Sequence, residues 1–86
     1  MANHPSALKR QRQDAKRQQK NRWWKSRVRS AARLVTDSVA KKKKKEAAEA
    51  LVVATREIYK AEGKGALHGN AAARKVARLS RLVASL

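Results

Sequence analysis

The sequence predicts an all-α protein, a three-helix bundle from which a long basic N-terminal helix projects. Three segments repeat apolar residues at alternating steps of four and three, which is the spacing of one helix face. The only proline, at position 5, and the glycines, at positions 63, 65 and 69, lie outside these segments. Between Leu8 and Trp23 the only apolar residue is Ala15, so this stretch has no face that could pack on a core. The 86 residues are expected to form a single domain, residues 1–86.

The first helix is expected over residues 7–40. Ser6 follows the proline and is expected to be the N-cap, because its hydroxyl can accept a hydrogen bond from the first turn. A packing stripe begins only at Trp24 and continues through Val28, Ala31 and Val35 to Ser38 and Val39. The segment before the stripe is polar and carries many like charges, which make an isolated helix marginal. We therefore expect residues 1–22 to be frayed or disordered in the isolated protein.

The second helix is expected over residues 46–62, after a break within residues 41–45. Five adjacent lysines form that break, because they repel one another and oppose the positive end of a following helix. Gly63 is expected to end the second helix in the left-handed conformation. The helix is apolar over a wide arc, so it is expected to touch both of the others. Its main stripe is Ala47, Leu51, Ala54, Ile58 and Ala61.

The third helix is expected over residues 70–85. Asn70 is the expected N-cap, since a side-chain carbonyl at this position can accept a hydrogen bond from the first turn. Apolar residues again recur at steps of four and three, which predicts one buried face. That stripe is Ala72, Val76, Leu79, Val83 and Leu86.

Charge is the dominant feature of the composition. Lys and Arg number 23 against 6 Asp and Glu, which gives a net charge of +17 and a pI near 11.6. Residues 1–33 carry eleven basic residues and one acid, and residues 63–86 carry five basic residues and no acid. Residues 34–62 carry seven basic and five acidic residues, so they are nearly balanced. The two terminal segments are therefore expected to bind a nucleic acid, which would neutralise their charge.

Several classes of function are excluded by what the sequence lacks. It has no cysteine for a disulfide or thiolate site, and His4 and His68 lie too far apart to suggest a metal site. Lys64 stands between two glycines but lacks the rest of a phosphate-binding loop, and no nucleophile is paired with a base. We expect no enzyme activity, cofactor, metal or small-molecule substrate. The apolar run at residues 50–54 is too short to span a membrane, and residues 1–13 contain no signal-peptide core.

The basic residues of the first and third helices fall on definite sides of each helix. One group occupies a sector of roughly 80° on the first helix, and a second group lies nearly opposite the packing stripe. Each of these side chains that neutralises a phosphate releases counterions, and arginine can add bidentate contacts. The first group is Lys9, Arg12, Lys16, Lys20 and Arg27, widened by Arg10 and Arg17; the second is Arg22, Lys25, Arg29 and Arg33; the third helix presents Arg74, Arg78 and Arg81.

Two adjacent tryptophans mark the start of the packing stripe. Trp24 lies on the stripe and is interpreted as a core anchor. Trp23 points roughly 100° away on the helix. It either stacks on an exposed base or sugar or covers the end of the bundle, and the sequence leaves both open.

Short motifs along nearly the whole chain, in order and at matching spacing, resemble one known family. They are MANH at residues 1–4, SALKR at 6–10, KSRVR at 25–29, ALH at 66–68 and AARK at 72–75, with Asn70 and the pair at 78–79. The family is the bacterial-type small-subunit ribosomal protein family numbered twenty. Pro5, the pair at 76–77 and the lysine run depart from its usual pattern.

The resemblance implies a structural constituent of the small ribosomal subunit, in the cytoplasm with other components of that subunit. It implies direct binding to small-subunit ribosomal RNA and a role in the assembly and folding of that RNA. Residues 1–22 are then expected to become helical on RNA. From the wheel and the resemblance together, the residues expected to contact RNA are Lys9, Arg10, Arg12, Lys16, Arg17, Lys20, Arg22, Lys25, Ser26, Arg27, Arg29, Arg33, His68, Asn70, Arg74, Lys75 and Arg78.

Two other readings are weaker. A DNA-binding or chromatin-like protein would use the basic first helix in a groove, but the apolar stripes favour an intramolecular bundle over a dimeric zipper. A membrane-active peptide, or an inhibitor of an acidic protein, is disfavoured because residues 8–22 lack the apolar face that binding to a membrane interface requires.

Overall fold

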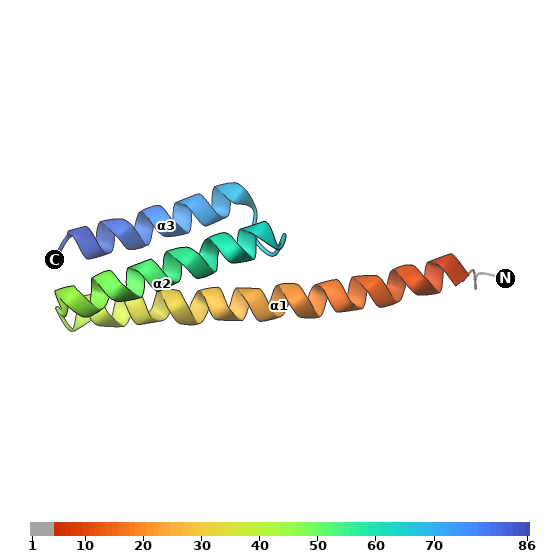
Figure 1. Cartoon of the computed structure of the whole chain (residues 1–86), viewed down its shortest axis with the longest axis horizontal. Coiled ribbons are helices and arrows are strands. Elements are labelled where there is room, and N and C mark those ends of the chain that lie inside the picture. The colour runs from red at the N-terminus through yellow and green to blue at the C-terminus, as the bar shows by residue number, and fades with distance from the viewer. Residues whose placement is uncertain (1–4) are drawn as a thin grey trace.

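The computed structural model describes residues 5–86, which form three helices joined by two short turns. Helix α1 spans Pro5–Ala40, α2 spans Lys44–Gly63 and α3 spans Gly69–Ala84 (Figure 1). The molecule measures 62 × 20 × 15 Å because α1 is much longer than the other two helices. The predicted fold class, all-helical with three helices and a long first helix, is confirmed.

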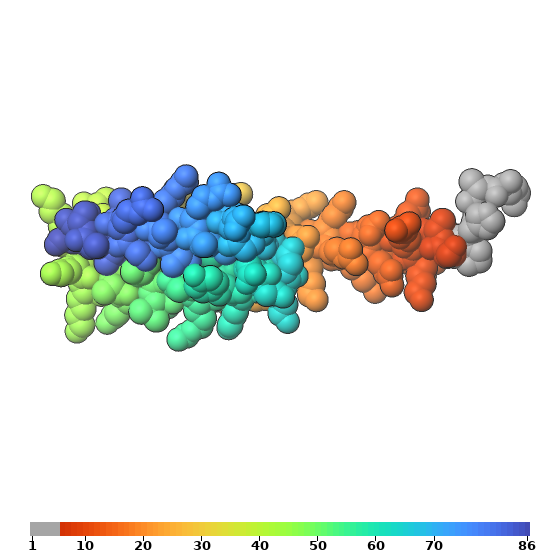
Figure 2. Space-filling model, turned by 90° about the horizontal axis from the view of Figure 1, so that it is seen from above, coloured from red at the N-terminus to blue at the C-terminus, as the bar shows by residue number. Residues whose placement is uncertain are grey.

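The three helices are packed side by side in alternating directions (Figure 1). Helix α2 packs against both α1 and α3, and α1 and α3 also contact each other. The bundle covers only the C-terminal part of α1, and the N-terminal part extends beyond it as a single helix (Figure 2). We call residues 6–22 of this part the extension. Helix α1 therefore runs without a break from the extension, which packs against no other helix, into the bundle.

The core is small and consists only of apolar side chains. Val35 and Ile58 are its largest fully buried side chains, and alanines fill much of the rest. Among residues 6–86 no polar or charged side chain is buried, so no desolvated charge needs a partner in the core. Small side chains let the helix axes approach closely, which suits a chain with so few aromatic residues. The clustered buried residues are Val28, Ala31, Val35, Ala54, Ile58, Ala61, Ala66, Ala72 and Leu79.

The start of α1 differs from the predicted one. The helix already includes Pro5, so Ser6 lies in the first turn and is not the N-cap. Proline suits the first helical position because its φ is preset and its missing N–H has no partner to lose there. Residues 5–22 are helical in the structure, the conformation expected on RNA, and the expected disorder of residues 1–22 in the isolated protein stays a prediction. Residues 1–4, with His4, lie outside the described residues.

The turn between α1 and α2 is a tight helix-ending motif within the lysine run. The Lys43 N–H donates to the Ser38 carbonyl and the Lys42 N–H donates to the Val39 carbonyl, both at 3.0 Å. This is the Schellman arrangement, whose central residue adopts a left-handed backbone. Lys42 holds that position with φ of 56° and, within residues 5–86, is the only residue other than glycine with positive φ.

The turn between α2 and α3 has the same motif, two residues later than predicted. Helix α2 continues through Gly63, and Gly65, with φ of 79°, is the left-handed residue. The Ala66 N–H donates to the Ala61 carbonyl at 2.9 Å, and the Gly65 N–H donates to the Glu62 carbonyl at 3.0 Å. The side chain of Ala66 is buried and belongs to the core cluster, which selects this end over the earlier one.

The N-cap of α3 is His68 and not Asn70, which was predicted. His68 has an extended backbone, and its Nδ1 atom accepts a hydrogen bond from the Asn70 N–H at 3.1 Å. The helix therefore begins at Gly69, and Asn70 supplies the capped N–H from inside the first turn. Histidine can fill this role because its unprotonated ring nitrogen is an acceptor.

At the left-handed position of both turns, glycine is expected to be more stabilising than a residue with a Cβ. Lys42→Gly is expected to raise the free energy of unfolding by about 1 kcal/mol, because glycine adopts positive φ without steric cost. Gly65→Ala is expected to lower it by about 1 kcal/mol, since the left-handed backbone strains a residue with a Cβ. A Cβ at Gly65 would meet no atom within 4 Å, so this loss reports the backbone alone. Urea unfolding followed by circular dichroism measures both; an unchanged or lower midpoint for Lys42→Gly would contradict the argument.

Candidate nucleic-acid interface

Every side chain predicted to contact RNA is exposed in the structure. The buried face of α1 holds Val28 and Val35, and that of α3 holds Ala72 and Leu79, so the basic residues are left on the outer faces. The helical repeat thus sorts each helix into an apolar side and a cationic side. The interface consists of several groups of basic residues, which differ in how the fold brings them together.

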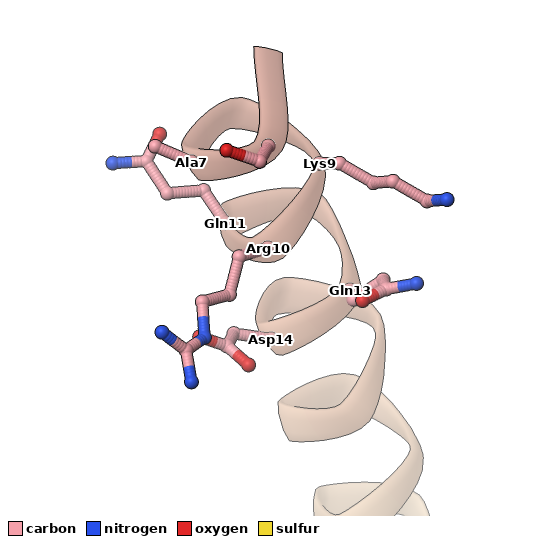
Figure 3. Close-up of a pocket in the computed structure, with 7 residues that line it drawn as sticks. Ala7, Lys9, Arg10, Gln11, Gln13 and Asp14 are labelled. Carbon is pink, nitrogen blue, oxygen red and sulfur yellow. The ribbon is translucent and has the colours of Figure 1, made fainter. Parts of the chain in front are cut away.

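The extension presents basic side chains on more than one side. Figure 3 shows Lys9 and Gln13 reaching out on one side of the helix and Arg10 and Asp14 on the other. A hollow lined only by residues 6–14 lies here, but it is the space between neighbouring side chains of a single helix. It has no opposite wall, so this segment offers contacts to a large partner and no enclosure for a small molecule.

Where the extension meets the bundle, the turn between α2 and α3 adds a further basic residue. Lys16, Arg17 and Lys20 of α1 line one hollow together with Lys64 and Gly65. We call Lys16, Arg17, Lys20 and Lys64 the junction cluster. Lys64 was not predicted as a binding residue. The available signal was topological, because an antiparallel α2 must end near the point of α1 where packing begins.

Another group of basic residues lies between α1 and α3. Lys25 and Arg29 of α1 and Lys75 of α3 line a hollow of about 240 Å³ whose apolar walls include Val28 and Leu67. We call these three basic residues the groove cluster. Their ammonium and guanidinium groups carry like charge into one narrow space, which a phosphate group would neutralise. Two helices therefore present cations to the same side, from positions 46 to 50 residues apart in the sequence.

Arg27 belongs to the predicted set, but the fold pairs it inside the protein. Its guanidinium donates two hydrogen bonds to the Glu57 carboxylate of α2, at 3.0 and 2.8 Å. The hydrogen bond from Arg27 lowers the pKa of Glu57, and the same bond raises the pKa of Arg27. The charge of Arg27 is thus already balanced by α2. The wheel of α1 alone could not reveal this pair, because it depends on how α2 is rotated against α1.

The tryptophan pair lies beside this ion pair. Trp24 is partly buried and packs against the core, as predicted, whereas 52% of the surface of Trp23 is exposed. The two rings meet edge to face, with centroids 4.8 Å apart and planes at 85°. The Arg27 guanidinium lies over the Trp23 ring, 4.9 Å from its centroid, in cation–π geometry.

The remaining predicted residues of α3 lie along its exposed side. The Nε atom of Arg74 donates to the Asn70 carbonyl at 3.3 Å, which holds this side chain along the helix. Arg78 lines a shallow hollow with Arg81 near the C-terminal end of α3. His68 is engaged through Nδ1 as the N-cap, so its other ring nitrogen is the one left for a hydrogen bond to a partner.

Comparison with known proteins decides the family. The sequence model of the family described as Ribosomal protein S20 matches residues 2–84. The chain belongs to the ribosomal protein S20 family. A protein of Desulfovibrio desulfuricans named small ribosomal subunit protein bS20 is 46% identical over 86 residues, which cover 100% of this chain and 97% of that protein. A protein of the same name from Nitratiruptor sp. is 45% identical over 86 residues and is covered over 96% of its length.

Membership of the S20 family confirms the resemblance read from the motifs and agrees with the expectation of a non-enzymatic protein. The family match spans both the extension and the bundle, so the two parts belong to one family unit. Within residues 5–86, no helix is both long and apolar enough to cross a membrane. The S20 assignment therefore directs attention to the cationic surfaces described above.

Proposed function

We propose that the chain is a structural constituent of the small ribosomal subunit that binds small-subunit ribosomal RNA directly and assists its assembly and folding. The observation that carries the proposal is the extension, a helix with no packing face, exposed on all sides and rich in Lys and Arg. Such a helix gains nothing from the bundle, so a polyanion is the partner that would stabilise it. The relatives are named small ribosomal subunit proteins, which supports the RNA of that subunit as the polyanion.

The two ends of the interface point in different directions, which suits a clamp. Five residues separate Lys20 from Lys25, a rotation of roughly 140° around the helix axis. The basic stripe of the extension, which is Lys9, Arg12, Lys16 and Lys20, and the groove cluster therefore lie on different sides of the continuous helix α1. The helix spaces them by roughly 24 Å between Lys9 and Lys25 at 1.5 Å per residue. Two RNA segments bound at these surfaces would be held at a defined distance.

The free energy of binding would come from phosphate neutralisation. Each Lys or Arg that contacts a phosphate releases condensed counterions, so affinity should fall steeply as salt rises. Specificity would come from RNA shape, because an A-form helix hides its base edges in a deep and narrow major groove. Ordering the extension on RNA would cost conformational entropy, which the phosphate contacts must offset. Protein partners within the subunit would meet the surfaces that RNA leaves open.

The test is a salt series of binding to intact small-subunit ribosomal RNA, with DNA and an unrelated structured RNA as competitors. We expect tight binding that survives near-physiological salt and resists both competitors. Binding that disappears at that salt, or that either competitor removes equally well, would reduce the chain to a general polyanion binder. The DNA arm also decides against the chromatin-like alternative, because a DNA-binding protein would prefer that competitor.

A further inference from the structure

Trp23 of α1 is a large aromatic side chain that remains exposed in the fold. The sequence left two roles open for it, stacking on RNA or covering the end of the bundle. Trp24 is among the partly buried residues packed against the core, and Trp23 is not. With 52% of its surface exposed, Trp23 covers little of the bundle. The covering role therefore belongs to Trp24.

The Trp23 ring is held in one orientation by its neighbours. Arg27 lies over the ring at 4.9 Å, and two hydrogen bonds at 3.0 and 2.8 Å fix Arg27 to Glu57 of α2. Trp24 supports the ring edge to face at 4.8 Å. An exposed side chain with so many fixed contacts loses little rotational freedom when a ligand covers it, which favours binding.

The position of Trp23 continues the basic stripe of the extension. It lies three residues after Lys20 and seven after Lys16, spacings that keep all three on one side of an α-helix. A nucleic-acid strand whose phosphates follow these lysines would reach the indole as the extension enters the bundle. A hollow of about 340 Å³ borders the ring, and its lining includes the paired Arg27 and Glu57, so this hollow lies on the side of the ion pair. The surface of Trp23 that remains exposed, 52% of the residue, is what a ligand can cover.

We propose that Trp23 stacks on an unpaired base of the RNA that follows the extension. The inference rests on the proposed function and deepens it by naming a single-stranded nucleotide as one of the bound elements. Base–aromatic stacking tolerates any base, because each base has a π-face, but it requires a base that is not enclosed in a duplex. Lys20 and Arg22 lie within three positions of Trp23 on α1, so a nucleotide stacked on the indole would have basic side chains near its phosphate.

The test compares wild-type full-length chain with Trp23→Ala, Trp23→Leu and Trp23→Phe in binding to intact small-subunit ribosomal RNA. Alanine and leucine are expected to lower affinity roughly 5- to 100-fold, and phenylalanine, which keeps a π-face, is expected to retain most of it. The slope of log affinity against log salt should not change, since a stacked base neutralises no phosphate. Tyr59→Ala is the matched control, because Tyr59 is an exposed aromatic residue of α2 outside the predicted RNA contacts, and its loss should leave the affinity unchanged.

The outcomes separate this inference from the proposed function. Wild-type chain that prefers ribosomal RNA, with Trp23→Ala and Trp23→Leu binding as tightly as wild type, would overturn the stacking role and leave the RNA-binding function standing. A loss that comes with a shallower salt slope would also overturn it, because the substitution would then act by displacing basic residues. Trp23→Leu keeps apolar bulk at the site and should fold like wild type. If its unfolding midpoint equals that of wild type, misfolding is excluded as the cause of a lower RNA affinity. Wild-type chain with no preference for ribosomal RNA would remove the function and the inference together.

Discussion

Replacing Lys9, Arg12, Lys16 and Lys20 together by glutamine is expected to lower affinity for small-subunit ribosomal RNA roughly 100- to 1000-fold near physiological salt. These four residues form the basic stripe of the extension and share one side of α1. Each lost phosphate contact removes the release of about one counterion, so the salt slope should also fall by roughly three to four units. Filter binding across a salt series measures both quantities. Glutamine has nearly the same helix propensity as Lys and Arg, so the substitutions remove charge without changing the intrinsic preference of α1 for helix.

The matched control removes the same charge from the other end of the molecule. Replacing residues 41–44, all lysines, by glutamine lowers the net charge by four in the turn between α1 and α2 and at the first residue of α2. The Lys43–Glu46 pair lost in this control is exposed and 3.6 Å long, so it contributes little to stability. We expect the affinity to change by only a few-fold. Equal losses in the two variants would mean that net charge alone drives binding and that no defined surface exists.

The helices and the core could be predicted from the sequence because they depend on local periodicity. Val28, Val35, Ala54, Ile58 and Leu79 were all assigned to packing stripes, and all are buried. With glycine and proline confined to a few positions, nothing in the chain competed with these repeats. Fold class thus followed from spacing that a single helix displays by itself.

The helix ends were predicted less well, since they depend on a few hydrogen bonds. Gly63 was expected to be left-handed, but Gly65 is, because this later end lets Ala66 enter the core. Asn70 was the conventional choice for an N-cap, yet the ring nitrogen of His68 accepts the hydrogen bond. In both cases, packing or hydrogen-bond geometry one or two positions away decides which residue ends or caps the helix.

The interface could be predicted as a set of exposed basic residues but not as an arrangement. Arg27 was assigned to RNA, and its pairing with Glu57, 30 residues away, appears only once α2 is placed against α1. Lys64 joins the junction cluster for the same reason. Helical wheels describe each helix alone, whereas pairing and clustering between helices depend on their relative rotation.

Ile58→Ala is expected to lower the free energy of unfolding by about 2–5 kcal/mol. Ile58 is fully buried and is one of the two largest side chains in the core. Its neighbours in the core cluster include many alanines, which are too short to fill the space left by the deletion. An 86-residue protein has a total stability on the order of 4–13 kcal/mol, so this one change removes a large share of it. Urea unfolding measured by circular dichroism tests the value.

Val52→Ala on the same helix is the control, because 59% of the Val52 surface is exposed and its loss should change stability by less than about 0.5 kcal/mol. Similar midpoints for the two variants would place Ile58 outside the cooperative core.

The core variant Ile58→Ala also separates the two parts of the interface. Only the folded bundle brings Lys75 of α3 to Lys25 and Arg29 of α1, whereas the extension carries its charges on one helix. Under mild denaturing conditions Ile58→Ala should therefore lose the contribution of the groove cluster to RNA affinity and keep that of the extension.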